Sequence, residues 1–491
     1  MGLGLLLLTS VGKDNLYLSV QPEITYFKIA YKRHTNYSIE PVPQYFKSTP
    51  DFSRKCTVNI SKNADLLGMI YLYVELPAII QDNSSFLPNG IKQFAWTDKI
   101  GIALIDYIEI EIGNNIIDRH YADWINIWHE LTNKKGIQSG YNKMIGSVPE
   151  LTTYSNGKSN YIIYVPLTFW FCQDSGLAVP LLSLTQSDIK INVSFNNFDI
   201  CYKETPNYYI QILENYSLFN YNEIITQNIN GVISSGKFIY YDITTQRLYY
   251  LKINGNFIIP TIANDPTYSI VGSDTNFTIN INPKLPYIVR DEDYFRFNTP
   301  SLINSYLLVN YIYLDNVERY QFIKNKHEYL IPIVQTLPNY VAYSSNINYK
   351  VSLSNPNKLL VWKSILQSSI QSNDIFNYTI NDDNIIINHK LIINSVERMG
   401  LGNYEHYTYL PKYQYKISST QNGIYMYSFC LDPTNFQPSG SLNFSKVEDA
   451  YLNLTMNKNI TYQNPAVITA YGLQYNLLKI EDGLGGLEFT I

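Results

Sequence analysis

The residues in this chain whose types could do chemistry are two histidines and a glutamate in the segment RHYADWINIWHEL. His120, His129 and Glu130 are residue types that bind zinc or transfer protons. If the whole segment is helical, the two histidines point about 180° apart, at about 100° per residue. The HExxH zinc motif also fails, because no histidine stands at its last position after His129. We therefore predict neither a metal site nor a cofactor site in this segment.

Other catalytic patterns are missing from the sequence. It contains no nucleophile elbow, no Walker loop and no dinucleotide fingerprint. Acidic pairs such as Asp291 with Glu292 stand in polar loop sequence, where solvated carboxylates are much commoner than catalytic pairs. The four cysteines are far apart and form no CxxC pair, which predicts buried thiols in a reducing compartment; they are Cys56, Cys172, Cys201 and Cys430. We assign no catalytic residue and predict that the protein is not an enzyme.

The charge distribution argues against direct nucleic-acid binding. The formal net charge is −5 and only 16% of residues are charged, so no global positive field exists to hold a polyanion. One basic cluster stands out near the N-terminus, formed by Lys28, Lys32, Arg33 and His34. It is either a functional surface patch or a set of ordinary ion pairs within the chain, and the sequence leaves both interpretations open.

The composition and the periodicity favour β-structure. The chain has 45 Tyr and 21 Phe among its 491 residues, and aromatic residues are enriched in strands. Several segments alternate cleanly between apolar and polar residues, which predicts strands with one buried face. The apolar positions of these segments are Ile70, Leu72, Val74 and Leu76; Ile108, Ile110 and Ile112; Ile189, Ile191, Val193 and Phe195; and Leu452, Leu454 and Met456.

Two local features connect these strands. A turn at Gly113 to Asn115 predicts a hairpin between the strand before it and Ile116 and Ile117. Apolar residues at helical spacing predict one helix, from about Asp118 to Thr132, with Asp118 as a possible cap. We expect this helix to plug a barrel end or to pack between subunits. Many short strands with helices confined to the connections indicate β-sandwiches or jelly rolls.

Seven sequence blocks, in order, resemble the double jelly-roll major capsid proteins of nucleocytoplasmic large DNA viruses. The blocks are Leu16 to Glu40, Ser53 to Ala78, Leu104 to Thr132, Tyr164 to Phe195, Leu307 to Ile331, Tyr427 to Met456 and Tyr475 to Thr490. The most family-specific tetrapeptide among them is the turn Gln437, Pro438, Ser439 and Gly440, to which we assign an architectural role.

The resemblance implies an all-β fold of two tandem eight-stranded antiparallel jelly-roll barrels with short connecting helices. It implies an N-terminal arm over residues 1–24, a first jelly roll over 25–322 and a second over 323–491. Residues 201–300 match no family motif but remain strand-like, so we expect a β-rich insertion that forms a tower on the outer surface of a shell. The two halves show no convincing sequence repeat, and the duplication is implied by the resemblance alone.

The resemblance also implies a function and partners. The expected role is a major capsid protein whose homotrimers form pseudo-hexagonal capsomers of an icosahedral virion, assembled in the cytoplasmic viral factory. Expected partners are neighbouring capsomers, minor capsid and penton proteins, and an internal viral membrane that the basic cluster would meet. Three alternatives stay open: a minor capsid paralogue, a membrane-shaping scaffold, or a receptor- or glycan-binding module carried on the tower.

Overall fold

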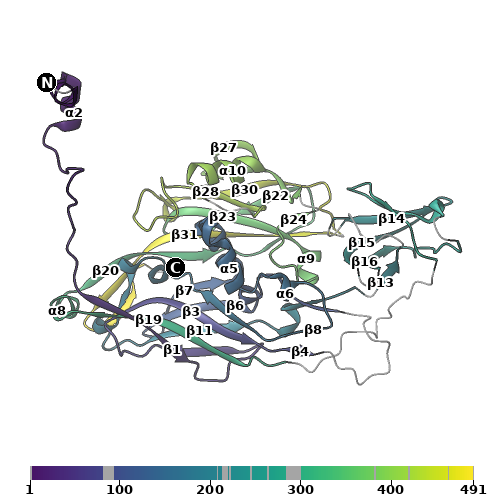
Figure 1. Ribbon diagram of the computed structural model, residues 1–491, viewed down its shortest axis with the longest axis horizontal. Coiled ribbons are helices and arrows are strands. Elements are labelled where there is room, and N and C mark those ends of the chain that lie inside the picture. The colour runs from purple at the N-terminus through teal and green to yellow at the C-terminus, as the bar shows by residue number, and fades with distance from the viewer. Residues whose placement is uncertain are drawn as a thin grey trace.

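The computed structural model contains strands through most of the chain (Figure 1). It describes residues 3–80, 93–206, 208–212, 219–220, 223–243, 246–262, 265–283, 300–380, 383–417, 421–462 and 464–489. Six short strands pair outside the main sheets: β4 Ile79–Ile80, β5 Phe94–Trp96, β8 Gly157–Lys158, β12 Tyr202–Glu204, β24 Thr379–Ile380 and β25 Asp383–Asn384. Four more add to the main sheets: β10 Val179–Pro180 pairs with β3 Leu66–Leu76, β21 Tyr340–Ala342 and β32 Leu484–Leu487 pair with β31 Ala466–Glu481, and β29 Leu442–Asn443 pairs with β23 Pro356–Leu366.

The first barrel consists of eight antiparallel strands in two sheets. The first sheet has the order β1 Tyr37–Tyr45, β19 Asn304–Leu314, β3 Leu66–Leu76 and β9 Tyr161–Pro166. The second sheet has the order β2 Lys55–Asn59, β11 Ile189–Phe195, β6 Ile105–Ile112 and β7 Asn115–Tyr121. Numbered along the chain from 1 to 8, the strands lie in the orders 1-8-3-6 and 2-7-4-5. This arrangement is a jelly roll.

The second barrel repeats this topology. Its first sheet has the order β20 His327–Thr336, β31 Ala466–Glu481, β23 Pro356–Leu366 and β28 Ile424–Ser428. Its second sheet has the order β22 Asn346–Lys350, β30 Ala450–Met456, β26 Ile386–Ile393 and β27 Val396–Asn403. Numbered in the same way, these strands again lie in the orders 1-8-3-6 and 2-7-4-5. The fold class implied by the resemblance is confirmed, and the duplication is visible in topology although it is not visible in sequence.

The alternation read from the sequence is confirmed in the strands. In β3, the side chains of Ile70, Leu72, Val74 and Leu76 are fully buried, while Tyr71 and Glu75 on the other face are partly exposed. The hairpin is confirmed too, because β6 pairs with β7 through a turn at Gly113 and Asn114, both with positive φ. A positive φ at both turn positions matches the right-handed twist of the two strands.

An insertion with its own small core separates β11 from β19. Its six-stranded sheet has the order β13 Tyr208–Gln211, β16 Arg247–Asn254, β15 Val232–Asp242, β14 Ile224–Ile229, β17 Ile270–Gly272 and β18 Thr278–Ile279. Ile225, Phe238 and Leu248 are among the buried residues of this sheet. The insertion lies at one end of the molecule, on the right in Figure 1. The β-rich insertion expected after residue 201 is therefore confirmed.

The helices are short and lie in connections and in the arm. They are α1 Leu3–Thr9, α2 Leu16–Ser19, α3 Ile100–Ala103, α4 Ala122–Thr132, α5 Gln138–Met144, α6 Pro149–Thr152, α7 Trp170–Gln173, α8 Asn316–Lys324, α9 Gln367–Gln371 and α10 Tyr404–Gln414. None of the helices that the structure describes is long and apolar enough to span a membrane.

The predicted start of the helix at Asp118 is wrong. Asp118 and His120 lie in β7, whose pairing with β6 extends to Tyr121, and α4 begins only at Ala122. The N-cap residue Tyr121 forms no side-chain cap, so Asp118 does not cap this helix. The strand pairing supplies the backbone hydrogen bonds that a helix would otherwise have to provide. The angular argument about His120 and His129 consequently does not apply, because only His129 lies in the helix.

Candidate functional site

The contact between the two barrels is the largest feature that the fold creates beyond the barrels themselves. The first sheet of the second barrel has two buried faces. Leu360, Trp362 and Ile468 point into the second barrel's own core. Val361 and Tyr471 point the other way and join the core cluster of the first barrel. One apolar core therefore continues from the first barrel across to the second. The two barrels lie side by side in Figure 1.

Helix α4 supplies the first barrel's side of this contact. The ring of Trp124 lies 5.5 Å from the ring of Tyr471 in β31 and 5.7 Å from that of Trp128, and both tryptophans are buried. Burying large aromatic side chains is the main hydrophobic contribution to such a contact. The helix was expected at a barrel end or between subunits; instead it packs against the second barrel of the same chain.

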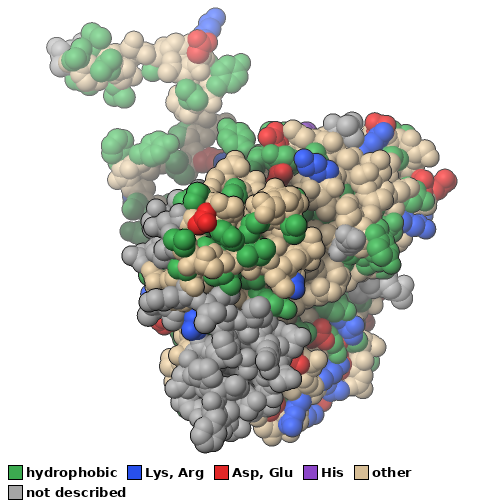
Figure 2. All heavy atoms as spheres, turned by 90° about the vertical axis from the view of Figure 1, so that its right-hand side faces the viewer, with side chains coloured by type: hydrophobic (Ala, Val, Ile, Leu, Met, Phe, Trp, Pro, Cys, Tyr) green, Lys and Arg blue, Asp and Glu red, His purple; other side chains and the backbone are tan. Residues whose placement is uncertain are grey.

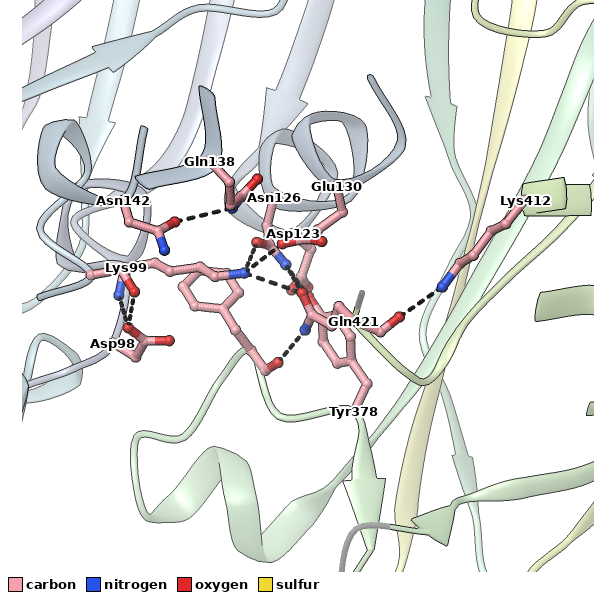
Figure 3. A network of polar contacts seen from close by, with 12 residues as sticks. Asp98, Lys99, Asp123, Asn126, Glu130, Gln138, Asn142, Tyr378, Lys412 and Gln421 are labelled. Carbon is pink, nitrogen blue, oxygen red and sulfur yellow. Dashed lines mark hydrogen bonds and ion pairs between the residues drawn. The ribbon is translucent and has the colours of Figure 1, made fainter. Parts of the chain in front are cut away.

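A polar network crosses the contact beside these rings (Figure 3). The ammonium group of Lys99 donates hydrogen bonds to Asn126 Oδ1 at 2.7 Å, to Glu130 Oε1 at 3.2 Å and to Gln421 Oε1 at 3.1 Å. Gln421 belongs to the second barrel, and its Nε2 donates to the backbone oxygen of Phe376 at 2.6 Å. Because Lys99 and Glu130 are both nearly buried, the ion pair between them is weakly screened by water.

A second charged group lies next to this network. Lys363 Nζ in β23 lies 2.7 Å from Asp123 Oδ2 in α4 and 5.0 Å from the centre of the Tyr378 ring. The Tyr378 hydroxyl donates to the other oxygen of Asp123 at 3.1 Å. Burial raises the pKa of Tyr378 well above its usual value, so this hydroxyl keeps its proton and remains a donor. The Lys99 to Gln421 hydrogen bond and the Asp123 and Lys363 ion pair therefore both link the two barrels.

A third group resembles a catalytic relay. His120 Nε2 lies 2.8 Å from Asp118 Oδ2, and His120 Nδ1 lies 2.8 Å from Thr168 Oγ1. This is the acid, histidine and hydroxyl order of a hydrolase triad. All three side chains are at most 3% exposed, which leaves no approach for a substrate. Asp118 Oδ1 instead accepts the backbone N–H of Val334 at 3.1 Å, so the relay joins the first barrel to β20 of the second.

His129 and the four cysteines also lie within the fold. His129 Nε2 contacts the Pro166 backbone oxygen at 3.3 Å, and burial lowers the pKa of His129 to about 4. All four cysteines are buried and free, as expected for core thiols. The described residues contain no group of three His, Cys, Asp or Glu side chains that could hold a metal ion. The acidic pair singled out in the sequence, Asp291 and Glu292, lies outside the described residues.

The predicted basic cluster lies in the segment between the arm and β1. Lys28, Lys32, Arg33 and His34 are all exposed. Within the described part of the chain the three cations form no ion pair, and His34 contacts only its neighbours Thr35 and Tyr37. The arm stands clear of the body and carries many apolar side chains (Figures 1 and 2).

The predicted turn lies on the second barrel between β28 and β29. Ser439 Oγ accepts the backbone N–H of Asp432 at 3.0 Å. Gly440 has a φ of +139°, and a Cβ there would meet the Phe429 backbone oxygen at 3.0 Å. Neither the basic cluster nor this turn takes part in the contacts described above between the two barrels.

Sequence reasoning missed the residues that form the contact. Asn126, Tyr378 and Gln421 carry no motif and come from distant segments. One signal was present: Lys363 interrupts the apolar strand LLVWKSIL, and a lysine buried in such a strand requires a partner. Nothing near Lys363 in sequence indicates that the partner is Asp123.

Two barrels of one strand order, joined side by side, define the class of double jelly-roll proteins. The family described as "Major capsid protein N-terminus" matches residues 25–315, and the family described as "Large eukaryotic DNA virus major capsid protein" matches residues 318–486. The chain belongs to the major capsid protein family of large eukaryotic DNA viruses, whose members are structural components of the virion capsid.

Similar proteins agree with this assignment. The "Probable capsid protein 4" of Acanthamoeba polyphaga mimivirus is 35% identical over 99% of both chains. The major capsid protein of Phaeocystis pouchetii virus is 28% identical over 99% of both. Two solved structures share the fold. The Faustovirus major capsid protein has a TM-score of 0.65, with 12% identity over 96% of this chain and 94% of that one. The PBCV-1 protein VP54 has a TM-score of 0.64, with 21% identity over 95% of this chain and 100% of that one.

Proposed function

We propose that this chain is a major capsid protein and that three copies form a pseudo-hexagonal capsomer in the icosahedral shell of a large double-stranded DNA virus. The observation that carries the proposal is that two barrels of identical strand order lie side by side in one chain. Three such chains around a threefold axis supply six similar barrels, which approximate a hexagon. Hexagonal tiles cover flat facets.

The rigidity of the pair of barrels supports this geometry. The Lys99 and Lys363 networks and the Asp118 bond hold one barrel against the other with hydrogen bonds, which have narrow geometric tolerance. A fixed angle between barrels lets every subunit present the same edges. We expect a large apolar interface within the trimer and smaller, more polar contacts between capsomers.

Light scattering coupled to size exclusion tests the trimer. The expected result is one species with a mass near three times 56.7 kDa. A well-folded monomer at micromolar concentration would contradict an obligate trimer.

The chain divides, in this proposal, into an arm over residues 1–24, a first jelly roll over 25–322 and a second over 323–491. The insertion between β11 and β19 forms the tower on the outer shell surface. Antibody fragments against β14 or β15 are expected to label intact particles, whereas fragments against the arm label only disrupted ones. The reverse pattern would invert the orientation.

The segment between the arm and β1, which carries the basic cluster, is proposed to meet internal partners. Lys28, Lys32 and Arg33 are unpaired cations within the described residues and stand beside exposed apolar side chains such as Phe27. This chemistry fits an anionic internal membrane or an acidic minor capsid protein. Flotation with anionic vesicles tests for the membrane partner. If the membrane is the partner, the wild-type protein floats with the vesicles and the triple variant Lys28→Ser, Lys32→Ser and Arg33→Ser does not. If minor or penton proteins are the partners, neither protein floats.

Assembly is proposed to occur in the cytoplasmic viral factory, and the role is proposed to be structural without catalysis. Four free, buried cysteines suit a reducing compartment. Fluorescent fusions followed through infection are expected to gather at the factory. Accumulation in the secretory pathway would contradict this.

A minor capsid paralogue is the second candidate. The relatives include the mimivirus proteins "Capsid protein 1", "Probable capsid protein 3" and "Probable capsid protein 4", so one virus can carry several members of this family. Quantitative mass spectrometry of purified particles distinguishes the two roles. A major protein is the most abundant chain, whereas a paralogue is present in far fewer copies.

Glycan binding is a third candidate, favoured by one hollow of about 450 Å³ at the base of the insertion. Tyr154, Tyr202 and Asp199 line it from the first barrel, and Asn373 lines it from the second. Aromatic rings beside acid and amide groups suit sugars, which stack on rings and form hydrogen bonds. Retention on a glycan array that is lost in Tyr202→Ser would support this candidate.

A further inference from the structure

The first sheet of the first barrel has an aromatic outer face. Tyr45, Tyr306, Tyr73 and Tyr164, here called the tyrosine row, are cross-strand neighbours on β1, β19, β3 and β9. Their ring centres are 5.6, 4.3 and 5.2 Å apart along the row. Tyr45 is 66% exposed and Tyr164 is 36% exposed. Tyr306 is partly exposed and Tyr73 is buried among the neighbouring rings. The row is therefore a continuous set of rings that solvent reaches most at its two ends.

The neighbouring cross-strand positions extend this apolar surface. Pro43, Leu308, Tyr71 and Pro166 form the next row on the same four strands. None of these four side chains is fully buried. The solvent face of an antiparallel sheet normally carries polar residues, and an extended apolar face on such a sheet marks a contact surface.

The equivalent sheet of the second barrel shows what covers such a face. Thr336, Tyr471, Val361 and Met426 form a row on β20, β31, β23 and β28, which are strands 1, 8, 3 and 6 again. Within this chain that row is covered by the first barrel, and Trp124 of α4 reaches Tyr471. Helix α4 directly follows β7, the fifth strand of its barrel. The structure thus shows one barrel-to-barrel contact within the chain, made by a helix that packs on this type of sheet.

The second barrel carries a helix at the matching position. Helix α10 directly follows β27, the fifth strand of the second barrel. Its inner side is fixed by Tyr407, whose ring lies 5.3 Å from that of Trp362. Its outer side exposes Tyr409, Leu410 and Tyr413, with Tyr413 88% exposed. In Figure 1, α10 lies at the top of the molecule and β1 and β19 lie at the bottom, at opposite ends of the stack of sheets.

We propose that α10 of one copy packs on the tyrosine row of a second copy of this chain, in the way that α4 packs on β31 and β23 within each chain. Such a contact is head-to-tail, because the helix and the sheet are different surfaces at opposite ends of the molecule. Head-to-tail contacts form closed rings when the rotation per copy divides a full turn. This proposal rests on the trimer proposed above and names its interface.

Site-directed crosslinking tests the contact directly. All four native cysteines are buried, so a new surface cysteine is the main reactive thiol. The double variant Tyr45→Cys with Tyr413→Cys, treated with a short bismaleimide, is expected to give covalent dimers and trimers and little beyond. Each single variant is expected to stay monomeric on a denaturing gel. Efficient crosslinking of Tyr45→Cys alone would mean a symmetric contact and would overturn the proposal, as would a double variant that does not crosslink within a trimeric sample.

Charge substitution supplies the second test. Tyr45→Glu with Tyr164→Glu places two carboxylates in the proposed contact, and at least a tenfold rise in the concentration at which half the trimer dissociates is expected. The matched control is Tyr462→Glu, at a tyrosine that is 82% exposed and lies outside both surfaces. Circular dichroism checks that each variant is folded. If the wild type is trimeric and the double variant dissociates no more readily than the control, the proposed interface is contradicted, whereas the proposed trimer is not. If the folded wild type is monomeric, both proposals fail.

Discussion

The carboxylate of Asp118 in the first barrel accepts a hydrogen bond from the backbone N–H of Val334 in the second, at 3.1 Å and across 216 positions of sequence. The same carboxylate contacts His120, which in turn contacts Thr168. A buried set of residues that resembles a hydrolase triad thus uses its carboxylate to link the two barrels. The arrangement explains how a chain with catalytic residue types in contact can serve an architectural role.

Replacing Asp118 is expected to destabilise the protein strongly. Asp118→Ala leaves the Val334 N–H and the His120 ring without their acceptor in a buried place, which we expect to cost about 3 kcal/mol of unfolding free energy. Denaturant unfolding followed by tryptophan fluorescence measures the change. The control is Asp188→Ala, which removes the partner of Lys62 in a surface ion pair and is expected to cost less than about 1 kcal/mol. Equal losses in the two variants would refute a bracing role for Asp118.

The sequence predicted what local patterns determine. The alternation in β3, the hairpin at Gly113 and the apolar stripe of α4 are each encoded within about a dozen residues, and all three are present. The start of α4 was predicted wrongly because Asp118 is a good capping type, while its actual role depends on Val334, which no local pattern connects to it. Lys99 and Gln421 meet across 322 positions for the same reason. The second jelly roll repeats a topology and not a sequence, so pattern comparison between the halves could not find it.

The pair Asp123 and Lys363 is expected to show strong energetic coupling. The Lys363 side chain is 3% exposed, so its charge is poorly hydrated and depends on Asp123. A double-mutant cycle with Asp123→Asn and Lys363→Met should give a coupling of about 1–3 kcal/mol in unfolding free energy. The exposed pair Lys326 and Glu481 provides the control cycle, with an expected coupling below about 1 kcal/mol. If the two cycles give the same coupling free energy, the pair Asp123 and Lys363 stabilises the protein no more than an exposed ion pair does.

Acidification is expected to destabilise the protein through buried neutral histidines. Burial lowers the pKa of His389 to about 3, and its Nδ1 accepts the indole N–H of Trp362 at 3.0 Å, which requires the neutral ring. The unfolded chain takes up a proton near pH 6.5. The stability that this group contributes is therefore complete above about pH 6.5 and is lost as the pH falls toward 3.

A histidine variant isolates this contribution from that of the carboxylates. His389→Gln retains an acceptor but does not titrate, so the slope of unfolding free energy between pH 6 and 4 should fall by about 1.4 kcal/mol per pH unit relative to wild type. The control is Asn348→Gln, at an exposed position of β22 with no titrating group, whose slope should equal that of wild type. An unchanged slope in His389→Gln would show that His389 is charged in the folded protein.

The turn at Gln437 to Gly440 is expected to depend on its glycine more than on its other residues. Gly440 has a φ of +139°, and an added Cβ would lie 3.0 Å from the Phe429 oxygen and 3.1 Å from the Cys430 Cα, both on the backbone. Gly440→Ala is therefore expected to lower the unfolding free energy by about 1–3 kcal/mol. Gly486→Ala is the control, because a Cβ there meets nothing within 4 Å. Since Gly440 belongs to neither α10 nor the tyrosine row, a trimer of normal mass with reduced thermal stability is the expected result. A trimer that dissociates in Gly440→Ala while Gly486→Ala behaves as wild type would instead place this turn at a subunit contact.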